Sequence, residues 1–196
     1  MRRDIRTFFG SYRKGCDRAD TLLFRAGDPE AVNEACKRSQ NGKLLPNALY
    51  VHRTALDDLV PLLRIYEGCA RAYLGEIDHA NIIKLHRFSG KVSYLAYPDF
   101  DSDPHPVLTQ SVKLSMRSLE LDCYDYSQSD NPPILHRKDA FLGADHPLRE
   151  RFARLTRQEE KHGLLGDAST IGTRDGWQRQ LEERGFKLKG HRLVRA

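Results

Sequence analysis

The segment from Tyr97 to Pro106 constrains the fold of this chain more than any other stretch. Its three prolines mean that it forms neither a helix nor a central strand. Carboxylates placed close together repel one another unless a positive charge lies among them, and a bound cation commonly supplies it. We therefore expect an irregular loop with a functional role. Three carboxylates and an imidazole fall within seven residues of it: Asp99, Asp101, Asp103 and His105.

The acidic residues of this loop allow two interpretations. They do not form an EF-hand calcium loop, because Pro104 replaces the required glycine and Gln110 stands at the twelfth position. A Mg²⁺ or Mn²⁺ site remains open, with Asp99, Asp101 and Asp103 as ligands, because hard cations prefer oxygen. His105 would then be a further ligand or a general base. The alternative is a solvated turn whose aspartates cap main-chain amides.

Two predicted hairpins flank the loop. Residues 81–87 and 91–97 form the first, joined by a three-residue turn that ends in Gly90. With that turn, Lys84 and His86 share a face with Val92 and Tyr94. The second hairpin pairs Ser111–Met116 with Leu119–Tyr126, and its residues alternate between apolar and polar, as in a half-buried ribbon.

Helical spacing accounts for much of the rest of the chain. We expect helices from about Thr54 to Leu74, from Pro147 to His162 and from Arg174 to Arg184. The fold class is therefore α+β, with an antiparallel sheet of at least four strands in two hairpins packed with several helices. We expect residues 1–46 to form an N-terminal arm or small helical subdomain, and residues 47–196 to form a single α+β domain.

Glu67 lies on the apolar stripe of the first of these predicted helices, four residues after Leu63 and three before Ala70. A carboxylate there needs a partner, because burying an unpaired charge is costly. One interpretation is a salt bridge or hydrogen bond to a neighbouring strand. The other is a catalytic carboxylate that completes the site, with Lys84 stabilising charge on a phosphate.

The charge balance favours a polyanionic partner, with 32 basic and 27 acidic residues. No apolar run approaches the roughly 20 residues of a membrane span, and the first residues lack the apolar core of a secretion signal. We therefore expect a cytoplasmic location and no membrane partner. The sequence lacks phosphate-loop, dinucleotide and serine-hydrolase motifs. The candidate DNA contacts are Arg87, Lys91, His136, Arg137, Lys138, Arg151, Arg154, Arg157 and Arg192.

Several peptides resemble the bacterial DNA phosphorothioation-associated family, across roughly residues 37–195. That family is described as methyltransferases with this region at the N-terminus. Methyl transfer is not expected here, because the sequence has no glycine-rich cofactor loop. The matching stretches are residues 91–95, 97–106, 129–138, 155–160 and 190–194.

The chain is most similar to the stand-alone nicking component of single-stranded phosphorothioation systems. That resemblance implies a metal-dependent DNA nickase, which acts in phosphorothioate modification and antiviral defence. It also implies partner proteins: a cysteine desulfurase, an ATPase and a sulfur-transfer component. We favour an enzyme on these grounds. The alternatives are a non-catalytic module that binds DNA or docks a partner, and an accessory to a methyltransferase.

Overall fold

The computed structural model describes residues 2–75 and 77–196 and confirms the α+β class. Six antiparallel strands form one sheet in chain order: β1 (Lys43–Leu44), β2 (Ala48–His52), β3 (Ile82–His86), β4 (Lys91–Ala96), β5 (Gln110–Ser115) and β6 (Leu121–Asp125). A separate ribbon follows, made of β7 (Phe186–Leu188) and β8 (Leu193–Arg195). The α-helices are α1 (Arg2–Phe9), α2 (Tyr12–Ala26), α3 (Pro29–Arg38), α4 (Pro61–Leu74), α5 (Arg149–Lys161), α6 (Ala168–Ile171) and α7 (Arg174–Glu183).

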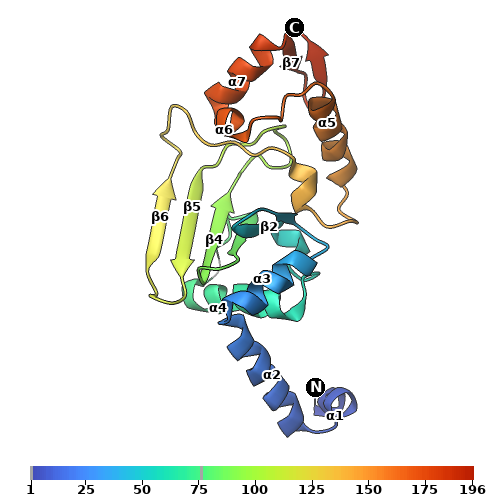
Figure 1. The fold of residues 1–196 in the computed structure, drawn as a ribbon, viewed down its shortest axis with the longest axis vertical. Helices are drawn as coiled ribbons and strands as arrows, with labels where there is room; N and C mark the ends of the chain where they lie inside the picture. Colours follow the sequence, from blue (N-terminus) through green and yellow to red (C-terminus); the bar gives the residue numbers. More distant parts are fainter. Residues whose placement is uncertain (1, 76) are drawn as a thin grey trace.

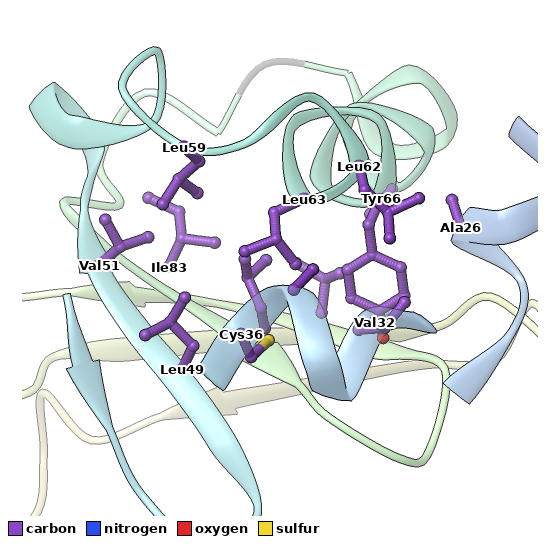
Figure 2. Packing of buried hydrophobic residues seen from close by; sticks show 14 of the residues in the cluster. Ala26, Val32, Cys36, Leu49, Val51, Leu59, Leu62, Leu63, Tyr66 and Ile83 are labelled. Atoms are coloured by element: carbon purple, nitrogen blue, oxygen red, sulfur yellow. The ribbon is translucent and has the colours of Figure 1, made fainter. Parts of the chain in front are cut away.

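One face of the sheet packs against α3 and α4 and forms the main core. Alternate residues of the strands point to this face, because successive side chains in a strand point to opposite sides. Figure 2 shows Leu49, Val51 and Ile83 from the strands lying close to Leu63 of α4 and Cys36 of α3. The helix α3 and the strand β1 thus belong to the body of the sheet, and α1 and α2 extend from it at one end (Figure 1).

The second face of the sheet is divided. Near the end of β4, the loop after Tyr97 and the helix α5 cover it with a second apolar cluster that includes Phe100, Leu135 and Phe152. The other half carries polar side chains instead. We call this half the open face and define it by Lys84, His86, Lys91, Ser93 and Lys113, which share one side of β3, β4 and β5.

The predicted register of the first hairpin is wrong. Lys84 pairs with Ser93 and Leu85 with Val92, so Lys84 and His86 lie on the face opposite to Val92 and Tyr94. The cause is the turn, which has four residues, Arg87 to Gly90, where three were expected. A change of one residue in a hairpin turn moves every side chain of a strand to the other face. The second hairpin does have the predicted faces, since Val112 pairs with Cys123 and Lys113 with Asp122.

The C-terminal elements α5, α6, α7, β7 and β8 gather at the end of the molecule opposite to the N-terminal helices (Figure 1). They enclose a third apolar cluster around Leu164, Trp177 and Phe186. Bridges from Val107 to Ile134 and from Pro133 to Thr173 attach this unit to the acidic loop. Among the described helices, none combines the length and the apolar character needed to cross a membrane.

Candidate functional site

The acidic loop is held by its own main chain and by Asp103. The carboxylate of Asp103 accepts a hydrogen bond from the amide of His105 at 2.8 Å, so the expected capping role is confirmed for this residue. Asp99 and Asp101 are exposed. Within the described residues, no three His, Cys, Asp or Glu side chains gather in a way that could hold a metal ion. The three aspartates as they stand do not form a ligand set, and metal binding stays a prediction.

His105 lies inside the protein and contacts a carboxylate that the loop does not provide. Its Nε2 is 2.7 Å from Oε1 of Glu159 on α5, and its Nδ1 is 3.3 Å from the carbonyl oxygen of Leu135. Both partners are acceptors, so both ring nitrogens are engaged as donors toward groups of the protein. His136 and Trp177 pack against the ring, with centroids 4.5 and 4.6 Å away. This imidazole positions the loop against α5 and is not free to act on an external substrate.

Lys138 is buried as well, with only 2% of its surface exposed. Its amine donates to the carbonyl oxygens of Phe100, at 2.6 Å, and of Asp103. The third neighbour of the amine is Nε2 of His191, at 3.3 Å. Burial lowers the pKa of Lys138 to about 7, although the nearby carboxylate of Asp103 partly opposes the shift. Lys138 therefore ties both ends of the aspartate-rich turn to the C-terminal unit.

His191 joins this buried amine to the protein surface. Its Nδ1 lies 2.9 Å from a guanidinium nitrogen of Arg151, which can only donate. Nδ1 therefore accepts, Nε2 carries the proton, and that proton needs an acceptor. The amine of Lys138 accepts it only when uncharged, and an uncharged amine offers two donors and one lone pair. That inventory fits the two carbonyls and His191. Burial, with Lys138 and Arg151 adding to it, also lowers the pKa of His191 to about 4.

His191 forms part of the wall of an open cavity that encloses roughly 700 Å³, which we call the basic pocket. The helix α5 supplies one wall, and the turn between β7 and β8 supplies the other. The side-chain oxygen of Gln158 accepts from the amide of Leu193 at 2.9 Å and so fixes the turn against the helix. The residues that line the pocket are Arg151, Arg154, Gln158, Lys189, His191 and Arg192.

The basic pocket has more cations than nearby carboxylates. Arg154 is 3.7 Å from Glu150, and both side chains are well exposed, so this pair contributes little. Lys189 and Arg192 have no carboxylate within 4 Å among the residues that the structure describes. Arginine side chains can grip phosphate through two parallel hydrogen bonds, so the pocket suits a phosphate group. Three predicted DNA contacts, Arg151, Arg154 and Arg192, meet here.

Other predicted DNA contacts have partners within the protein. Arg87 binds the side chain of Asn33 and the carbonyl oxygens of Leu45 and Pro46. Arg137 pairs with Glu160, and Arg157 pairs with Glu150, at 2.8 and 2.7 Å. These contacts make the three arginines structural.

Two further predicted contacts lie elsewhere. His136 donates from Nε2 to the carbonyl of Ile171 at 2.8 Å, and burial lowers the pKa of this ring to about 3. Lys91 lies on the open face together with Lys84, away from the acidic loop. Lys84 and the acidic residues thus do not form one site.

Glu67 also lies apart from the acidic loop. It is buried on α4, where the hydroxyl of Tyr94 donates to its Oε1 at 3.1 Å and Arg71 approaches its Oε2 at 3.4 Å. This confirms the interpretation of a hydrogen bond to a neighbouring strand. The helix α4 packs on the face of the sheet opposite to the loop, so Glu67 does not complete a site with Asp99 or Asp101.

Sequence reasoning did not select Glu159 or His191. Glu159 follows Phe152, Leu155 and Thr156 at helical spacing, and all four are buried on one stripe of α5. The same signal selected Glu67, so Glu159 could have been found. His191 gave no such signal, because its partners Lys138 and Arg151 come from distant parts of the chain.

The chain matches no protein-family model, and comparisons with curated proteins and with solved structures found no match either.

Proposed function

We propose that this protein binds the phosphate backbone of DNA through its basic pocket, as a component of phosphorothioate modification. The observation that carries the proposal is the meeting of Arg151, Arg154, Lys189 and Arg192 around one open cavity. Pairing cations with phosphates releases counterions from DNA, which drives binding that does not depend on sequence. The resemblance to the phosphorothioation-associated family is the reason to choose DNA among the polyanions.

The geometry of the pocket supports a positioning role. Its arginines project from a rigid helix, and the turn that holds Lys189 and Arg192 is fixed by Gln158. Phosphate contacts of this kind set the register and orientation of a duplex but carry no base information. We therefore expect affinity without strong sequence preference from the pocket itself. In this view the protein presents DNA to its proposed partners, the cysteine desulfurase, the ATPase and the sulfur-transfer component.

Binding of a fluorescent DNA duplex, followed by anisotropy over a range of salt concentrations, tests the proposal. The double variant Arg154→Gln, Arg192→Gln should weaken binding and flatten the dependence of log affinity on log salt by about two contacts. Arg179→Gln is the matched control, since Arg179 is exposed on α7 outside the pocket and its loss removes the same kind of charge. Equal losses in the pocket and control variants would show that net charge alone explains binding.

A second candidate function is DNA nicking, which one observation favours. An uncharged imidazole, His191, stands on the wall of the pocket and is joined to the amine of Lys138 behind it. A phosphodiester held by the arginines would therefore have a group beside it that can take up or release a proton. The acidic loop with Asp99, Asp101 and Asp103 remains the proposed place for Mg²⁺ or Mn²⁺.

Conversion of supercoiled plasmid to open circles, in the presence of Mg²⁺, Mn²⁺ or a chelator, tests the nicking function. His191→Asn and Asp101→Ala should abolish nicking while duplex binding persists. A folded wild-type protein that binds DNA but leaves the plasmid supercoiled under all three conditions would reject nicking by the isolated chain. That result would leave the binding proposal standing.

A further inference from the structure

The open face of the sheet carries a row of basic side chains that the basic pocket does not account for. Lys84, Ser93 and Lys113 are direct neighbours across β3, β4 and β5, because Lys84 pairs with Ser93 and Ser93 with Lys113. The next row holds Lys91, opposite Ser115, and the ring of His86, whose Nε2 lies 3.0 Å from Oγ of Ser93. Five polar side chains thus cover adjoining positions on one flat surface.

This surface concentrates positive charge. Lys84 and Lys91 have no carboxylate within 4 Å in the described part of the chain, and Lys113 pairs with Asp122 at 2.7 Å. Burial lowers the pKa of His86 to about 4, and the charges of Lys84, Lys113 and Lys91 lower it further. The three lysines are therefore close enough to act on one imidazole. Like charges facing one another across a sheet destabilise it, which makes an anionic ligand the natural complement.

Aromatic rings border the row of lysines on both sides. On β2, the ring of Tyr50 lies under the ammonium of Lys84, 5.2 Å from the ring centroid. On β6, Tyr124 lies beside Lys113 at 5.6 Å, and 47% of its surface is exposed. Tyr126 stacks next to Tyr124, with centroids 6.5 Å apart and planes inclined by 27°. An exposed tyrosine next to a lysine offers a base a stacking surface and a phosphate a charge.

We propose that the open face binds a single-stranded segment of nucleic acid, with phosphates over Lys84, Lys91 and Lys113 and a base stacked on Tyr124. The inference rests on the proposed function, because it assumes DNA as the ligand and names the form of it that this surface takes. Unpaired bases expose their faces to aromatic side chains, whereas the bases of a duplex stack on one another. Flat sheets with aromatic and basic residues suit the first kind of ligand.

The test is anisotropy with a fluorescent oligothymidylate of about 12 nucleotides, within the roughly 4–16 that one binding surface commonly covers. Tyr124→Leu should reduce affinity about five- to tenfold, the usual loss of a stacked base. The double variant Lys84→Gln, Lys91→Gln should reduce both the affinity and its dependence on salt. Lys187→Gln, an exposed lysine on β7, is the matched control and should bind as the wild type does.

The outcomes separate this inference from the proposed function. If the open-face variants bind the oligonucleotide like the wild type while Arg154→Gln, Arg192→Gln weakens it, the inference is overturned and the basic pocket alone binds DNA. If the wild-type protein binds neither the duplex nor the oligonucleotide, both proposals are overturned. The expected result is a selective loss of single-strand binding in the open-face variants, with duplex binding retained.

Discussion

Nε2 of His105 lies 2.7 Å from Oε1 of Glu159, although 54 residues separate them in the chain. Both side chains are buried, and together they attach the acidic loop to α5. The pair also places the loop beside Lys138, which reaches into the same region from the segment before α5. Two distant parts of the sequence are therefore held together by polar contacts inside the protein, where each contact depends on its partner.

Glu159→Gln should lower the free energy of unfolding by roughly 3–5 kcal/mol, because removing one partner of a buried ion pair leaves the other uncompensated. Urea denaturation followed by tryptophan fluorescence measures the loss, and Trp177 reports it directly because its ring contacts His105. Glu160→Gln is the matched control. Its partner Arg137 is well exposed, so the change should cost about 0–1 kcal/mol. Similar losses in the two variants would contradict a special role for the buried pair.

Lys138 should make the protein more stable as the pH rises from about 7 to about 9. Its pKa is lowered from 10.5 to about 7 in the folded protein. In this range the unfolded chain binds more protons at this site than the folded chain does, so the free energy of unfolding rises with pH. The slope is at most about 1.4 kcal/mol per pH unit. Above pH 9 Cys36 opposes the trend, because burial raises its thiol pKa to about 11.

The variant Lys138→Met tests this assignment. It loses the two hydrogen bonds to main-chain carbonyls, so we expect lower stability at every pH. The diagnostic result is the slope, which should be smaller than in the wild type between about pH 7 and 9. Burial also lowers the pKa of Lys43, so a residual slope is expected. Equal slopes in the two proteins would show that the amine of Lys138 is charged in the folded state.

Acidification should destabilise the protein through four histidines. Burial lowers the pKa of His52, His86 and His191 to about 4 and that of His136 to about 3. Their ordinary value is 6.5, so the unfolded chain takes up protons first as the pH falls. The stability is complete above about pH 6.5 and is lost progressively toward about pH 4. Urea midpoints at about pH 7, 6 and 5 should fall in that order, and His86→Asn should reduce the decline.

The sequence was a good guide to elements and a poor guide to contacts between them. Alternation in residues 111–126 was enough to predict both faces of the second hairpin, because period-two patterning and burial go together in strands. The prolines of the loop likewise predicted its irregular course. By contrast, His105 meets Glu159, and Lys138 meets His191, across more than 50 residues. No local periodicity encodes such a meeting, so the buried polar cluster could not be assembled from the sequence alone.

The register of the first hairpin shows how small the missing information can be. The count of residues in its turn was wrong by one, and this moved Lys84 and His86 to the opposite face from the one predicted. The positive φ of Gly90, 65°, lies at the end of this turn, where a glycine had been recognised but its partner residues had not. The open face is a consequence of that single residue.

Gly90→Ala should destabilise the protein by about 1–2 kcal/mol, since φ is 65° at this position and a side chain there strains the backbone. The added Cβ would also lie 3.1 Å from the side chain of Arg117, which is flexible and can move. Gly68→Ala is the matched change within α4, where an added Cβ meets nothing within 4 Å. It should stabilise the protein by about 0.5–1 kcal/mol, because alanine is the better helix former. Thermal unfolding of the two variants beside the wild type measures both effects. Opposite shifts in Tm are expected, and a stabilised Gly90→Ala protein would mean that the turn adopts another conformation and that the register of the open face needs revision.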